Sequence, residues 1–351
     1  MYHERRLPIY LALAYALLTA YACLHPFAGW RDTGISPFAF LVGPWPQYVT
    51  LTDLWLNALG FVPLGFMLAA SFSRDTRTRT VLIFATVLCA LLSFTLELSQ
   101  NYLPTRFASN VDLATNILGG AVGAVIGRRW AEIFAYDGFL HRWRRHRILP
   151  GHIGEVGMVL VALWWLTQLE PTTTLFGTGD MRPLFDLPAA ITFSARRFVV
   201  IEAMIVSMSV LALGLLVQRC MRERSGLLVA IVLLGGLAVR SLADYVFIIP
   251  PDPWHWATPG VVRGLVIGVV ALVVAWRLPG WLQHSLACVA LLLSTVLVNI
   301  APENPFELTS MRLIHEGHFL NFHGLTRLAD FLWPFLALIY LSANAALASR
   351  R

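Results

Sequence analysis

Residues 53–60, DLWLNALG, recur with few changes at residues 112–119, DLATNILG. In both copies an Asp and an Asn stand four residues apart at the head of a long apolar run. Residues four apart lie on one face of an α-helix, about 6 Å apart along its axis. Each copy therefore predicts the start of an apolar helix that presents an acid and an amide on the same side.

The composition indicates that these helices lie in a membrane. Of the 351 residues, 57% are hydrophobic and 13% are charged, and the mean hydropathy is +0.67. A soluble domain carries about a quarter charged residues. A bilayer span needs about 20 mostly apolar residues, and we expect ten such stretches, at 7–25, 51–72, 80–100, 111–127, 152–169, 198–218, 227–249, 261–277, 281–300 and 325–347. The sequence therefore predicts an all-α, polytopic integral membrane protein with about ten transmembrane helices.

The arginines predict how these helices are oriented. A net charge of +6 would suit a nucleic-acid partner, but the basic residues cluster in alternate connections, such as SRDTRTRT after the second stretch and QRCMRERSG after the sixth. Basic residues in short loops favour the cytoplasmic side. We therefore interpret the charge as an orientation signal, expect both termini in the cytoplasm, and expect no nucleic-acid partner.

A basic and aromatic segment at 131–150 contains no plausible span. It divides the chain into a four-helix membrane domain at 1–130 and a second membrane domain of about six helices at 151–351. The segment itself is expected to be a cytoplasmic linker, either an interfacial helix attracted to anionic lipids or a plain basic connection.

Polar residues gather where the second, third and fourth predicted helices meet the extracytoplasmic surface. Charged groups inside membrane spans cost roughly 2.5–3.5 kcal/mol each on insertion scales, so they indicate function. The third stretch ends in TLELSQNYLPTR, with a Glu and a Gln three residues apart and an Arg in the next loop. Arg suits bidentate recognition of carboxylates or phosphates. The candidate ligand-binding residues are Asp53, Asn57, Glu97, Gln100, Arg106, Asp112 and Asn116.

Each of these residues also has a structural interpretation. Asp53 and Asp112 suit helix N-caps, and the two asparagines suit hydrogen bonds between helices. Arg106 suits an ion pair with Glu97. The glycines that follow Asn116 suit close helix packing.

The same motifs, in this order, resemble the VanZ-like membrane protein family. DLWLNALGFVPLGF, followed by ELSQNYLPTRFASNVDLATNILGGAVGAVIG, is similar to that family's N-x-L-G-x-x-P-L-G-F helix, its E-x-x-Q, its loop Arg, its D-x-x-x-N and its Gly-rich helix. The resemblance covers about residues 1–130. It implies a bacterial inner-membrane protein with a role like glycopeptide resistance, because the family's named member raises resistance to teicoplanin. It implies no reaction, because the family's biochemical activity is not established.

The second half carries weaker signals. Arg240 and Asp244, and likewise Arg327 and Asp330, lie within one helical turn, and we expect each pair to neutralise itself. The aromatic loop at 170–197 is expected to lie on or dip into the membrane interface. The loop at 301–324 contains HEGH, but zinc binding by H-E-x-x-H needs histidines four apart, so no metal is expected. No cofactor motif is present.

Three functions remain open on this evidence. The first is a non-enzymatic protein that binds a membrane lipid or a lipid-linked cell-envelope intermediate at the polar site. The second is an intramembrane enzyme acting on such a lipid, with oxygen ligands for a divalent metal. The third is a proton-coupled transporter, although the sequence shows no clear inverted repeat.

Overall fold

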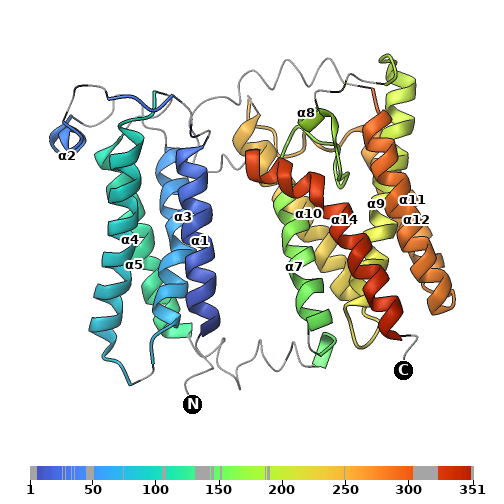
Figure 1. Ribbon diagram of the computed structural model, residues 1–351, viewed down its shortest axis with the longest axis horizontal. Helices are drawn as coiled ribbons and strands as arrows, with labels where there is room; N and C mark the ends of the chain where they lie inside the picture. The colour runs from blue at the N-terminus through green and yellow to red at the C-terminus, as the bar shows by residue number, and fades with distance from the viewer. Residues whose placement is uncertain are drawn as a thin grey trace. The chain divides into compact units, whose positions relative to one another are not determined.

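The computed structural model of the chain is built from α-helices (Figure 1). It describes residues 6–25, 27, 29–32, 34, 36–44, 51–73, 75–104, 108–130, 143, 146–150, 152–185, 187, 190–248, 250–302 and 323–348. The helices are α1 (Arg6–Leu24), α2 (Ala39–Val42), α3 (Leu51–Ala70), α4 (Thr78–Gln100), α5 (Asn110–Trp130), α7 (His152–Thr167), α8 (Arg182–Phe185), α9 (Ala195–Arg219), α10 (Gly226–Phe247), α11 (Pro259–Ala275), α12 (Gly280–Ile300) and α14 (His323–Ala348). Within these described residues there is no β-strand, only an isolated bridge between Ile148 and Met221.

Each of the ten predicted apolar stretches coincides with a long helix. Among the described residues, six of these helices are long and apolar enough to cross a membrane: α4, α5, α9, α10, α12 and α14. In α1, α3, α7 and α11 the described apolar stretch is shorter, at 10–17 residues. The helices and their apolar character therefore confirm the prediction of an all-α membrane protein.

The chain forms two compact units. Unit 1 lies within Met1–Arg144 and contains α1 to α5, with α3 packed on α5 and α1, and α4 packed on α5. A seam of glycines holds α3 and α5 together. A Cβ at Gly119 would overlap the backbone of Ala58, and one at Gly123 would overlap that of Val62. The predicted packing role of these glycines is confirmed.

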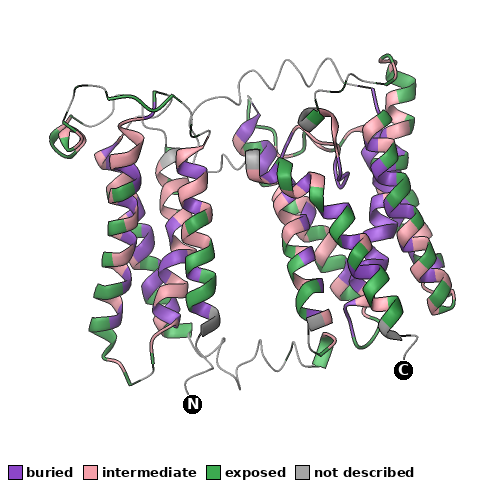
Figure 2. Cartoon of the chain, in the orientation of Figure 1, coloured by how far each residue is buried: buried purple, intermediate pink, exposed green. Residues whose placement is uncertain are grey.

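Unit 2 comprises the described residues from 146 onward and is organised around α9. This helix packs against α11 and α12, contacts α10 and α14, and is buried along most of its length (Figure 2). Local sequence sets the starts of two neighbours. Ser225 caps α10 by accepting from the N–H of Leu228, and Thr258 caps α11 by accepting from the N–H of Val261. Side-chain hydroxyls in this position satisfy donors that a first helical turn leaves free.

The first part of the connection from α7 to α9 is buried among the helices of unit 2. Residues 170–180, here called the buried segment, have no helical structure, yet Glu170, Phe176 and Gly179 are buried. Side chains of α10, α12 and α14 satisfy the backbone of this segment.

The basic linker lies largely outside the described residues, so its predicted interfacial helix is not described. Its last part pairs with the turn after α9, where the N–H of Leu149 donates to the carbonyl of Cys220. The HEGH sequence at 315–318 also lies outside the described residues.

Candidate functional site

Two of the predicted site residues meet directly between α3 and α5. The amide nitrogen of Asn57 donates a hydrogen bond to Oδ1 of Asp112 at 2.8 Å. Each of these residues comes from one copy of the repeated motif, with Asp112 in the first turn of α5 and Asn57 in the second turn of α3. The glycine seam below this pair brings the two helices close enough for the short side chains to touch.

Glu97 reaches from α4 to the start of α5. Its Oε2 accepts a hydrogen bond from the backbone N–H of Ser109 at 2.8 Å, and its side chain is 4% exposed. Ser109 is the residue before α5, and its own hydroxyl accepts from the N–H of Asp112 at 3.3 Å. The N-cap of α5 is therefore Ser109, and the alternative that assigned this role to Asp112 is corrected.

The arrangement resembles a capping box divided between two helices. In an ordinary capping box the N-cap hydroxyl bonds to the N–H of the third helical residue, whose own side chain bonds back to the N-cap N–H. Here Glu97 supplies that second bond from α4. The carboxylate of Asp112 is thereby left to accept from Asn57 on α3.

Asn116 and Gln100 complete the layer. The amide nitrogen of Asn116 donates to the hydroxyl of Ser93 on α4 at 3.0 Å, and that of Gln100 donates to the carbonyl of Cys23 on α1 at 3.1 Å. Asn116 is 6% exposed, and its Oδ1 has no hydrogen-bond partner within the part of the chain that the structure describes. The layer therefore joins all four long helices of unit 1 and contains one buried acceptor that these residues leave unsatisfied.

Two predicted members of the site cannot be placed in this layer. Arg106 and the side chain of Asp53 lie outside the described residues. Among the described residues, no group of three or more His, Cys, Asp and Glu could hold a metal ion. What the layer offers chemically is a set of carboxylate and amide oxygens at the end of an apolar helical unit.

Sequence reasoning missed Ser93 and Ser109 as partners. The signal for Ser109 was present, because S-x-x-D before an apolar run is typical of a helix start, and the sequence there reads SNVD. Ser93 had no comparable signal, since a serine inside an apolar helix more often bonds to its own backbone.

Unit 2 contains a second set of buried polar residues. Arg240 and Asp244 form an ion pair at 3.1 Å, which confirms the predicted neutralisation within α10. The corresponding prediction for α14 was wrong. Arg327 is exposed, whereas Asp330 is 3% exposed and accepts hydrogen bonds from the buried segment. The two residues do not pair because Asp330 faces the interior of the unit and accepts from the buried segment, whereas Arg327 faces outward.

Fold and site together define a helical membrane protein with a polar layer at one end of its first unit. Residues 10–132 match the model of the VanZ/LLP1 family, so this part of the chain is VanZ-like, as its motifs predict. The match lies within unit 1 and contains all seven predicted site residues. No curated protein and no solved structure matches the chain.

Proposed function

We propose that this protein binds a cell-envelope lipid or amphiphile at the polar layer of unit 1. The observation that carries the proposal is the buried Oδ1 of Asn116, which has no partner among the described residues. A buried polar atom of this kind needs an explanation, such as a water or a ligand. An amphiphile suits the position, because its head would meet the polar layer while its chain lies along the apolar helices.

The residues divide the recognition between them. Asn116 accepts a hydrogen bond from a hydroxyl or amide of the ligand head group, and Asn57 and Asp112 form the adjacent wall. Arg106, in the connection between α4 and α5, binds an anionic group such as the phosphate of a polyprenyl-linked intermediate, for which guanidinium geometry is well suited. Glu97 fixes the start of α5 and so positions the layer.

The proposal includes a location and an orientation. The VanZ-like region and the apolar helices support placement in the bacterial plasma membrane. We propose ten spans, with the polar layer at the extracytoplasmic surface and both termini in the cytoplasm, because the Arg-rich turns alternate along the chain. Arg128 supports this orientation, since it donates to the carbonyls of Ser73 and Thr76 at the end of unit 1 opposite the polar layer.

The test is mass spectrometry of the lipids that copurify with the full chain from native membranes. We expect one envelope lipid to be enriched in the wild type and reduced at least several-fold in Asn116→Ala and Arg106→Ala. Asn344→Ala is the matched control, because Asn344 lies in unit 2 and donates to the carbonyl of Arg219. Equal enrichment in all four proteins, with equal insertion into the membrane, overturns the proposal.

A further inference from the structure

The buried segment of unit 2 is irregular backbone inside an assembly of apolar helices. It reaches Asp330, seven residues into α14, and Arg240, seven residues before the end of α10. Each position lies about 10 Å from its helix end. Irregular backbone at membrane depth is tolerated only where protein groups or a water-filled cavity satisfy its N–H and C=O groups. The side chains that satisfy the segment are therefore essential to its position.

Helix α14 offers the segment a free carbonyl. Pro334 has no N–H, so the carbonyl of Asp330, four residues earlier, has no helical partner. The N–H of Gly179 donates to that carbonyl at 2.9 Å. Gly179 has a φ of +87°, and a Cβ there would lie 2.8 Å from Cγ of Pro334 and 2.7 Å from Cγ2 of Thr295. Only glycine fits this contact.

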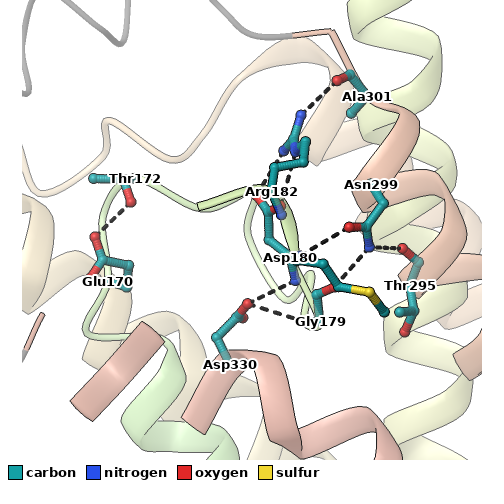
Figure 3. A network of polar contacts seen from close by, with 10 residues as sticks. Glu170, Thr172, Gly179, Asp180, Arg182, Thr295, Asn299, Ala301 and Asp330 are labelled. Carbon is teal, nitrogen blue, oxygen red and sulfur yellow. Dashed lines mark hydrogen bonds and ion pairs between the residues drawn. The ribbon is translucent and has the colours of Figure 1, made fainter. Parts of the chain in front are cut away.

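The carboxylate of Asp330 points at the same turn (Figure 3). Its Oδ2 accepts from the N–H groups of Gly179 at 3.2 Å and Asp180 at 3.1 Å. From α12, Asn299 donates to the carbonyl of Gly179 at 2.7 Å and accepts from the N–H of Met181 at 2.9 Å. The turn is thus held between a neutral amide on α12 and a carboxylate on α14.

Among the described residues, the two arginines that bind the segment or its neighbours are already engaged. Arg182 pairs with Asp180 at 2.7 Å and donates to the carbonyl of Ala301. Arg240 pairs with Asp244 and donates to three carbonyls of the segment. Their charges are therefore balanced by partners other than Asp330.

Among the described residues, the remaining charged groups near Asp330 do not neutralise its carboxylate. Glu170 is a second buried carboxylate, which accepts from the hydroxyls of Thr172 and Thr326. Arg327, on the preceding turn of α14, is exposed. In the part of the chain that the structure describes, no basic side chain forms an ion pair with Asp330.

Oδ1 of Asp330 is an unused acceptor in this site. The residue is 3% exposed, and among the described residues this oxygen has no hydrogen-bond partner. A buried carboxylate is strongly disfavoured unless a cation or a proton neutralises it. The two N–H groups at Oδ2 satisfy one oxygen but carry no net charge.

We propose that Asp330 binds a monovalent cation, either H⁺ or Na⁺, at Oδ1, and that this cation keeps the buried segment docked on α14. With the cation bound, the carboxylate of Asp330 is neutralised and both of its oxygens have partners. Without it, the charge favours exposure of the carboxylate to water, so Asp180 loses its acceptor and Gly179 keeps only the carbonyl of Asp330. The proposal goes beyond lipid binding and concerns different residues. Intramembrane carboxylates with this kind of surroundings mark ion and proton pathways.

The test is hydrogen–deuterium exchange of the segment in the full chain, followed by mass spectrometry. Asp330→Asn keeps an oxygen for the two N–H groups and is neutral without a cation. It also leaves the sequence of the segment unchanged, so intrinsic exchange rates cancel when it is compared with the wild type at each pH. Glu223→Gln, at an exposed position after α9, controls for the loss of one negative charge.

In Na⁺-free buffer, we expect the wild-type segment to match Asp330→Asn at low pH. At higher pH it should exchange faster, by about tenfold per pH unit once the proton is lost, as for a single titrating group. Restoration of protection by added Na⁺ identifies Na⁺ as the cation, and no effect of Na⁺ identifies the proton. Two outcomes overturn the proposal: the same ratio of exchange at every pH and Na⁺ concentration, or a segment that is unprotected in Asp330→Asn at all pH values.

Discussion

Arg240 holds three backbone carbonyls of the buried segment, those of Glu170, Pro171 and Thr173, at 2.6 to 2.8 Å. Its charge is balanced by Asp244, one turn later on the same helix. A guanidinium can do this because its donors lie in one rigid plane and stay charged. The residue therefore links charge balance inside α10 to the position of a segment 70 residues earlier in the chain.

We predict that Arg240→Met destabilises unit 2 by about 3–5 kcal/mol, because it leaves Asp244 buried without its partner. Arg327→Met is the matched control, since Arg327 precedes Asp330 within one helical turn, as Arg240 precedes Asp244, but is exposed. Thermal unfolding in detergent measures the difference between the two variants. Equal shifts in melting temperature would show that Arg240 has no special role.

In unit 1, two substitutions of Glu97 can be compared with each other to test its hydrogen bond to Ser109. Glu97→Gln keeps an oxygen that can accept from the N–H of Ser109, whereas Glu97→Leu removes it. An unsatisfied buried donor costs about 1–3 kcal/mol, so the Leu variant is expected to be less stable than the Gln variant by that amount. Amide exchange in the first turn of α5 reports the loss directly. Similar protection in both variants would contradict the assigned role.

At the scale of the element, α3 and α5 approach so closely that only glycine fits at several contacts. Gly65 packs on Gly120, and Gly127 packs on Phe66. The contact extends along most of both helices, which explains why the repeated motifs at their starts end up side by side.

We predict that Gly123→Ala separates α3 from α5 and destabilises unit 1 by about 1–3 kcal/mol, the usual cost of overpacking. Gly43→Ala is the control, because a Cβ there would make ordinary contact at 3.4 Å and the backbone has φ of −66°. Amide exchange of α3 and α5 peptides is the measurement. Unchanged protection in Gly123→Ala would contradict the prediction, because it would show that the added methyl group does not separate α3 from α5.

The helices themselves were largely predictable from the sequence, because each apolar stretch is long and its boundaries carry few competing signals. The gathering of Asn57 and Asp112 at one end of unit 1 followed from the repeat, but their direct bond joins the amide position of one copy to the acid position of the other, which the repeat alone did not specify. The exchange of capping partners between Glu97 and Asp112 did not follow, because it depends on how far α4 extends beside α5.

The buried segment was not predictable for a different reason. A stretch such as EPTTTLFGTGD, rich in Thr and Gly, has the composition of a surface loop. Its burial depends on Arg240, Asn299 and Asp330, which lie far along the chain and show no local sign of their targets. Sequence patterns indicate which residues are neighbours on one helix. The partners of this segment lie on three different helices, α10, α12 and α14.

At the scale of the whole molecule, the two units differ in the observations from which their functions are proposed. Unit 1 contains the VanZ-like match at residues 10–132. Unit 2 matches no curated protein or solved structure, so its assignment depends on its own contacts. The two proposals therefore assign lipid binding to unit 1 and cation binding to unit 2 of the same chain.

The proposed orientation gives a prediction for the complete chain. Reporter tags inserted at Asp75 and Glu223, and at the C-terminus, are expected on the cytoplasmic side, because these turns are rich in Arg. A tag at Asp252 is expected on the opposite side. Protease or dye accessibility from each side of the membrane measures this. A tag at Asp252 that faces the cytoplasm would contradict the proposed topology.

The position of the buried segment also has a consequence for synthesis. Its anchors follow it along the chain, with Arg240 about 70 residues later, Asn299 about 120 and Asp330 about 150. At translation rates of about 5–20 residues per second, the last anchor emerges roughly 8–30 s after the segment. During that interval its peptide groups lack their final partners. The segment's peptide groups therefore gain their final partners in stages, from Arg240 first and from Asp330 on α14 last.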